Sequence, residues 1–141
     1  MAEKRYLRMV DFEVIVTDLA VGAVSATFAL ASASKFRDPT GAIAGVDALG
    51  FRRPSDITGR VLPVLEGGLA IALLVPASRA IAGAAALVLL GVFSFAIARA
   101  LRAGRHPTCH CFGRHSRPIN ANVLVRNGAL AALALVVAIR S

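Results

Sequence analysis

The sequence predicts an all-α integral membrane protein built as a four-helix bundle. Hydrophobic residues make up 57% of the 141 residues, above the roughly 45–50% of a soluble globular domain. The chain contains no Trp, and small and aliphatic residues supply most of its hydrophobicity, as expected where helices pack closely in lipid. Charged residues lie mostly in blocks between long uncharged runs. This clustering is typical of membrane-spanning helices with charged connections.

Four apolar runs are long enough to cross a bilayer, and we expect them to form one transmembrane domain over residues 1–141. The first covers residues 14–34 and is broken only by Asp18; a helix of that length spans the hydrocarbon core of roughly 30 Å. The other three cover residues 57–76, 80–98 and 121–139. Their short connections predict an up-and-down bundle. Both termini then share one side of the membrane, and the two larger loops share the other.

The first of these loops, residues 35–60, contains a candidate amphipathic segment. Its apolar positions are Ile43, Val46, Leu49 and Phe51, which suit a short helix lying at the membrane interface. A lid over the second loop is one interpretation, and plain interfacial packing is the other. Within the spans, glycines favour close helix contact at positions Gly22, Gly67, Gly68, Gly83 and Gly91.

The formal net charge is +8, which raises the question of nucleic-acid binding. Few of the basic residues lie within the long apolar runs, and aromatic platforms for base stacking are missing. Arg and Lys that flank membrane spans explain the charge instead, because they help to set topology and contact anionic headgroups. The expected partner of these charges is the lipid bilayer, with no nucleic acid.

Both cysteines and all three histidines of the chain lie in one stretch, "HPTCHCFGRH" at residues 106–115. A thiolate attacks disulfides or binds metals, and nearby positive charge lowers the pKa of a thiol. Cys109 and Cys111 are surrounded by basic residues, and no acid occurs from residue 67 to residue 141. A disulfide between cysteines one residue apart closes a small, strained ring, which favours exchange over structural bracing.

The same atoms support a metal interpretation. Cys109 and Cys111, with His106, His110 and His115, offer thiolates and imidazoles suited to a tetrahedral zinc or a cuprous ion. The spacing is tighter than the two to four residues usual in zinc loops, and only one cysteine pair is present. An ordinary polar loop between two apolar helices is the third interpretation.

Several segments together resemble a known family. They are "SKFRDP" (34–39), "LPVLEGGLAIALL" (62–74), the Phe93/Phe95 stretch, "RAGRHPTCHCFG" (102–113) and "VRNGALAALAL" (125–135). On these motifs the chain resembles the methylamine utilisation protein MauE family, relatives of the DoxX-like four-helix membrane proteins. The likeness covers most of the chain. His110 stands where many members carry a small residue, usually Gly, which strengthens the metal alternative.

The resemblance implies four transmembrane helices and a role beside a thioredoxin-like redox protein. In the methylamine system that role is the maturation of a disulfide-rich dehydrogenase subunit outside the cytoplasm. The resemblance does not by itself assign methylamine metabolism or an enzyme activity to this chain. Carried over residue by residue, it marks Lys35, Glu66, Cys109, Cys111, Phe112, Gly113, Arg126 and Asn127.

Glu66 is the most informative residue outside the cysteine loop. A charged side chain inside the membrane is costly unless it is paired, and so it indicates a functional site. Arg126 and Lys35 are the candidate partners. Two roles remain open: a pair that fixes helix register, or a carboxylate that moves the protons accompanying thiol exchange. Asp18 in the first span is an alternative intramembrane acid, or it faces the bundle interior.

Two rules predict opposite orientations of the protein in the membrane. The two large loops carry ten of the 16 basic residues, namely Lys35, Arg37, Arg52, Arg53, Arg60, Arg99, Arg102, Arg105, Arg114 and Arg117. The positive-inside rule would therefore place the cysteines in the cytoplasm. An exchanging disulfide belongs in an oxidising compartment, and the family role agrees. We therefore expect the cysteine loop outside the cytoplasm.

These observations predict a multi-pass cell-membrane protein that exchanges thiols and disulfides through Cys109 and Cys111, a candidate thiol–disulfide oxidoreductase. Its partner would be a thioredoxin-like protein and its client a secreted, disulfide-containing protein. The sequence contains no quinone or haem motif. The first alternative is a membrane copper- or zinc-binding carrier that uses the Cys/His loop. The second is an assembly scaffold without redox chemistry.

Overall fold

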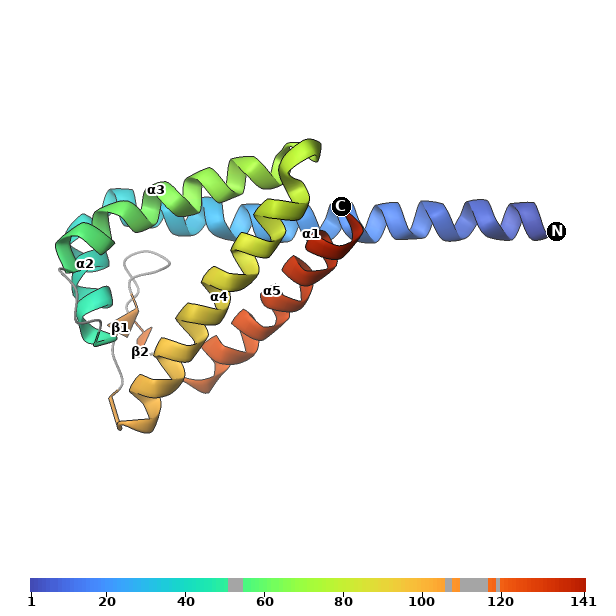
Figure 1. The fold of residues 1–141 in the computed structure, drawn as a ribbon. Helices are drawn as coiled ribbons and strands as arrows, with labels where there is room; N and C mark the ends of the chain where they lie inside the picture. The colour runs from blue at the N-terminus through green and yellow to red at the C-terminus, as the bar shows by residue number, and fades with distance from the viewer. Residues whose placement is uncertain (51–54, 106–107, 110–116, 119) are drawn as a thin grey trace.

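The structure is a computed structural model, and it describes residues 1–50, 55–105, 108–109, 117–118 and 120–141. Within these residues four helices are long and apolar enough to span a membrane: α1 (Ala2–Arg37), α3 (Ser55–Leu74), α4 (Arg79–Arg102) and α5 (Ala121–Arg140). The predicted all-α, multi-pass membrane architecture is confirmed. Figure 1 shows the four helices converging, with the N-terminal part of α1 projecting beyond the others.

Lipid-facing surfaces of these helices are apolar, as a membrane protein requires. Ile71 on α3, Phe95 on α4 and Val125 on α5 are 67%, 71% and 73% exposed. In water such an apolar exterior would be an aggregation hazard. In a bilayer it is the surface that lipid tails cover.

The first loop begins with a sharp change of direction between α1 and the short helix α2 (Pro39–Ala48). Proline disfavours helical backbone in the residue before it, and Asp38 accordingly leaves the helix with φ −133° and ψ 76°. Its Oδ1 then accepts a hydrogen bond from the Gly41 nitrogen at 3.0 Å, which caps α2. Asp38 therefore both ends α1 and starts α2.

Helix α2 covers much of the candidate amphipathic segment. Val46 is buried and Ile43 is half-buried, while Phe51 lies outside the described residues. Helix α2 packs mainly on α3, because Gly59 leaves room for Ile43: a Cβ atom at position 59 would lie 2.6 Å from Ile43 Cγ1.

The connection between α3 and α4 is one of the predicted short connections. Helix α3 ends at Leu74, two residues before the end predicted from hydropathy, since Val75 precedes Pro76 and adopts an extended conformation. A single 3-10 turn, η1 (Pro76–Ser78), then leads into α4. The Ser78 hydroxyl donates to the Ala72 carbonyl at 2.7 Å, which satisfies one of the carbonyls left over at the end of α3.

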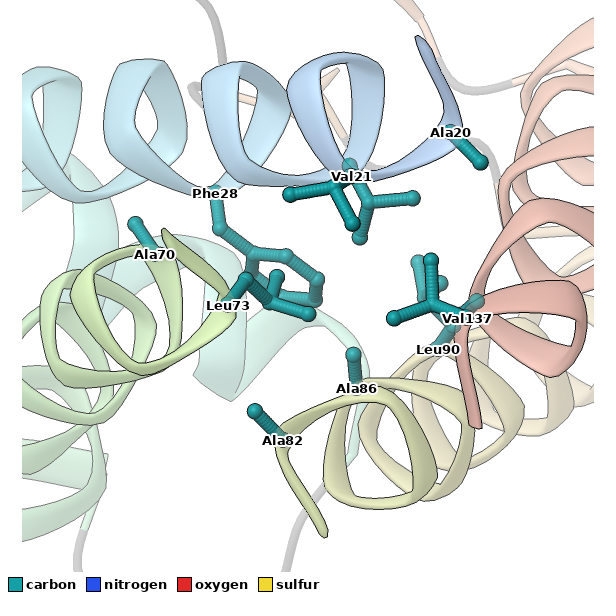
Figure 2. Packing of buried hydrophobic residues seen from close by; sticks show 11 residues of the cluster. Ala20, Val21, Phe28, Ala70, Leu73, Ala82, Ala86, Leu90 and Val137 are labelled. Carbon is teal, nitrogen blue, oxygen red and sulfur yellow. The ribbon is translucent and has the colours of Figure 1, made fainter. Parts of the chain in front are cut away.

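The spanning helices form a closed ring around one core. Helix α1 packs mainly on α3 and α4 mainly on α5, while α1 with α5 and α3 with α4 complete the ring. Figure 2 shows the core, in which Phe28 and Leu73 face Leu90 and Val137 across the bundle axis. Alanines such as Ala86 and Ala134 fill the places where helices approach most closely.

Only some of the predicted glycines lie at close helix contacts. A Cβ atom at Gly83 would lie 2.9 Å from the Ala138 nitrogen, so this glycine sets the separation of α4 and α5. A Cβ atom at Gly67 would lie 3.0 Å from the Ser32 hydroxyl oxygen, so this glycine also lies at a close helix contact. A Cβ atom at Gly22, Gly68 or Gly91 would meet nothing within 4 Å. The expectation of a close helix contact was therefore wrong at these three positions.

Candidate functional site

A buried ion pair joins α1 to α3. Lys35 Nζ lies 2.7 Å from Glu66 Oε1 and 2.8 Å from Oε2, and the two residues are only 6% and 3% exposed. Of the two partners predicted for Glu66, Lys35 forms the pair. With both carboxylate oxygens bound to one ammonium group, each charge offsets the cost of burying the other.

The apolar pattern of each helix explains why these two charges meet. On α3 the buried positions Leu62, Glu66, Ala70 and Leu73 recur every three or four residues, so they form one helical stripe. On α1, Phe28, Ala31 and Lys35 are similarly spaced. Each charge thus sits within the stripe that the fold must bury.

Hydroxyl groups extend this contact along the α1–α3 interface. The Ser32 hydroxyl donates to the Pro63 carbonyl at 2.7 Å, and the Ser25 hydroxyl donates to the Ala70 carbonyl at 2.8 Å. Both are buried hydrogen bonds between helices. The sequence analysis missed these serines, although both occupy the same stripe of α1 as Phe28 and Lys35.

A cavity of about 70 Å³ lies beside the ion pair, between all four spanning helices. Its polar wall contains Lys35, Glu66, Arg126, Asn127 and Thr27. Its apolar wall is formed by Phe28, Ala31, Leu90, Phe93, Ile97, Val123 and Leu130. Four residues marked by sequence, Lys35, Glu66, Arg126 and Asn127, therefore line one cavity. Phe28 is a lining residue that the sequence analysis did not mark, although it lies two helical turns before Lys35.

Arg126 and Asn127 reach the cavity from the second turn of α5. The Asn120 side chain caps this helix by accepting from the Asn122 nitrogen at 3.1 Å. Asn127 is 6% exposed, whereas Arg126 is exposed at the edge of the cavity. Arg126 does not form the salt bridge with Glu66 that was one of the two predicted alternatives.

The cysteine segment lies at the end of the bundle where α4 stops and α5 starts. Strand β1 (Thr108–Cys109) pairs antiparallel with β2 (Arg117–Pro118), with Cys109 opposite Arg117 in the register. Cys111, Phe112 and Gly113 lie outside the described residues, as do the candidate metal ligands His106, His110 and His115. Among the described residues, no cluster of three or more potential metal-binding side chains is present.

Helix α2 and the strands β1 and β2 lie at one end of the bundle (Figure 1). The two loops approach each other here, since a Cβ atom at Gly50 would lie 3.3 Å from Arg105 Nη1. Gly50 follows α2, and Arg105 follows α4 by three residues. Lys35 lies near the end of α1 that precedes α2.

Two acids of α1 form ion pairs with cations at the other end of the spanning helices. Asp18 is exposed and pairs with Arg79 at 3.3 Å, while Glu13 pairs with Arg140 at 3.7 Å. Asp18 therefore does not face the bundle interior, and it is not among the residues that line the cavity beside Glu66. Its partner is a cation at the start of α4 that the sequence analysis did not connect with it.

The fold and this cavity define a multi-pass α-helical membrane protein with a buried lysine–glutamate pair beside a polar cavity. The family model described as "Methylamine utilisation protein MauE" matches residues 13–140, and the chain belongs to that family.

One curated relative extends this comparison. The chain is 43% identical over 82 residues to "Methylamine utilization protein MauE" of Methylophilus methylotrophus. The matched segment covers 56% of this chain and 43% of the relative, so it spans less than half of the relative's length. No solved structure matches the chain.

Proposed function

We propose that this protein is a membrane thiol–disulfide exchange protein that serves methylamine utilisation. Its reactive groups are Cys109 and Cys111, its partner is a thioredoxin-like protein, and its client is a disulfide-containing protein outside the cytoplasm. Membership of the MauE family supports the link to methylamine utilisation. The two cysteines, one residue apart in a basic segment, support the thiol chemistry.

One observation carries the proposal: the strand that holds Cys109 pairs in register with Arg117, at the end of the bundle where the loops meet. No acidic residue follows Glu66 in the chain, so the residues from α4 through α5 contribute only positive charge here. Such an environment favours a thiolate over a thiol. Arg126, one helical turn into α5, adds to the same positive field.

The exchange proceeds through a mixed disulfide. One cysteine thiolate attacks a disulfide of the partner, a new S–S bond forms, and one partner sulfur leaves as a thiolate. The second cysteine then attacks the mixed disulfide and releases the other partner thiolate. The Cys109–Cys111 pair is thereby oxidised by two electrons and the partner disulfide is reduced to a dithiol. In the reverse direction the same steps oxidise the partner.

In this proposal the Lys35–Glu66 pair positions the site. Both Glu66 oxygens bind Lys35, which favours a role in fixing α1 against α3 near the loops. Proton transfer by Glu66 is the second candidate role. It is supported by the position of the carboxylate beside a cavity large enough for water.

Trapping the mixed disulfide tests the proposal directly. Cys109→Ser and Cys111→Ser should each be expressed with a thioredoxin-like protein that carries its disulfide, and the partner thiolate released by the attack should be alkylated at lysis so that it cannot reverse the exchange. At least one single variant is expected to form a reducible cross-link, because the resolving step is blocked. Cys109→Ser/Cys111→Ser is the matched control and should form none. If neither single variant is trapped and the double variant still supports client maturation, the exchange proposal fails and the scaffold alternative is supported.

Metal analysis of the purified protein distinguishes the exchange proposal from the metal-carrier alternative. Stoichiometric copper or zinc on the purified protein, lost on substitution of His106, His110 or His115, would favour a metal carrier. The exchange proposal instead expects those substitutions to leave the disulfide cross-link in place.

A further inference from the structure

We infer that the cavity beside the Lys35–Glu66 pair binds a small monoanion, a carboxylate attached to a short apolar body. The inference rests on the described lining residues and does not depend on the cysteine chemistry.

The buried side-chain amide of Asn127 lacks a hydrogen-bond partner among the described residues. Asn127 is 6% exposed and lines the cavity, yet within the described part of the chain its side chain makes no hydrogen bond. A buried amide without partners costs about 1–3 kcal/mol, and buried polar groups in proteins nearly always have partners. The NH₂ group of Asn127 therefore calls for an oxygen acceptor inside the cavity.

The charged side chains of the cavity lining favour an anion over a cation. The lining includes two basic side chains, Lys35 and Arg126, and one acidic side chain, Glu66. Because both Glu66 oxygens are bound to Lys35, the carboxylate is already engaged and offers little to an incoming cation. An anion gains more in this setting than it would in water, because the surrounding helices have a low dielectric constant.

The volume of the cavity and its apolar lining residues fit a short carboxylate. At roughly 10–15 Å³ for each water-sized group, a cavity of about 70 Å³ holds about five such groups. Acetate and propionate are of this size. The lining also includes Phe28, Phe93 and Leu130, which suit a methyl or ethyl group better than a second polar group.

Binding should be measured on the full chain in nanodiscs by equilibrium dialysis with ¹⁴C-labelled acetate and propionate. Saturable binding of one anion per chain is expected. Asn127→Leu removes the donor and should weaken binding roughly 10- to 100-fold, the range for a hydrogen bond to a charged group. Asn122→Leu, at an exposed position on the same helix, should leave binding unchanged.

Thermal unfolding followed by circular dichroism keeps the test independent of folding failure. Asn127→Leu should melt at or above the wild-type temperature, since it removes a buried amide without partners. Asn127→Asp, which keeps the shape but adds a negative charge, should also abolish anion binding.

A chain-length series separates a soluble ligand from one supplied by the bilayer. If the Asn127-dependent part of binding stops rising beyond propionate, the ligand is a soluble carboxylate. If it continues to rise through octanoate to palmitate, the anion is a lipid carboxylate that enters from the membrane. Absence of saturable binding in the wild type would overturn the inference, because water alone would then satisfy Asn127. Saturable binding of methylammonium in place of the anions would overturn it as well.

Discussion

Lys35 Nζ binds both carboxylate oxygens of Glu66, at 2.7 and 2.8 Å, although the two residues are 31 positions apart in the chain. The contact ties the end of α1 to the middle of α3, across the whole of the first loop. Both members of the pair also line the polar cavity, together with Arg126 and Asn127 from the second turn of α5. The pair therefore links the packing of the spanning helices to the geometry of the candidate site.

Breaking this pair on one side should destabilise the protein strongly. Lys35→Met leaves the Glu66 charge buried without its partner, a change that costs about 3–5 kcal/mol. The free energy of unfolding, measured by titrating the protein in mixed micelles with a denaturing detergent, should fall by that amount. Glu66→Leu should show a loss of similar size, since it strands Lys35.

Two variants serve as controls for the pair. Lys35→Met/Glu66→Leu should recover much of the loss, because no uncompensated charge remains. Asp18→Asn breaks the exposed pair with Arg79 and should cost at most about 1 kcal/mol. If the double variant is as unstable as the sum of the single ones, the two charges do not act as a pair.

The approach of α4 to α5 depends on Gly83. A Cβ atom there would lie 2.9 Å from the Ala138 nitrogen and 3.1 Å from the Ala134 carbonyl oxygen, and backbone atoms cannot move aside cheaply. Gly83→Ala should therefore destabilise the bundle by about 1–3 kcal/mol. Gly91→Ala on the same helix meets no atom within 4 Å and should be neutral or slightly stabilising. Equal stability of the two variants would contradict the packing described for this interface.

Helix α2 is held on α3 by the space that Gly59 leaves for Ile43. Gly59→Ala would bring a methyl group to 2.6 Å from Ile43 Cγ1, so α2 should be displaced from α3. Trypsin should then cleave more rapidly after the exposed Arg37, next to the start of α2. Gly68→Ala, which meets nothing within 4 Å, is the control on α3. An unchanged cleavage rate would show that α2 is not anchored through this contact.

The spanning helices were predictable because lipid imposes one simple requirement on the sequence. Each span needs a long apolar run, and the runs around Val24, Leu73, Leu90 and Val137 are uninterrupted by more than one or two charges. Helix ends were less predictable, since they depend on local chemistry. Val75 leaves α3 because Pro76 follows it, a steric effect that hydropathy does not register.

The candidate site was predictable in its members and less so in its pairing. Sequence marks Glu66 because a charge in apolar surroundings is costly, it offers Lys35 and Arg126 as candidate partners, and the family resemblance adds Asn127. It does not choose between Lys35 and Arg126 as the partner of Glu66, since that choice depends on which helices are neighbours in the ring. The sequence also does not tell which glycines lie at helix contacts. Gly83 and Gly91 lie on one helix, and only tertiary packing distinguishes them.

Orientation in the membrane is the prediction on which two physical rules disagree. The excess of Arg and Lys in the two loops favours the cytoplasm, while thiol–disulfide exchange with a secreted client requires the oxidising side. Charges recruited to stabilise a thiolate would inflate the loop count without setting topology. We therefore expect the cysteines outside the cytoplasm.

Labelling in intact cells decides between the two orientations. The only cysteines are Cys109 and Cys111, so a membrane-impermeant maleimide reports on this segment alone. If the proposed exchange site rests as a disulfide, labelling should be weak without reductant and strong after mild reduction, because a small strained ring is readily reduced. Cys109→Ser/Cys111→Ser gives the background. If label enters only after the cells are permeabilised, the segment faces the cytoplasm. The client would then be a cytoplasmic protein, and the orientation would agree with the positive-inside rule.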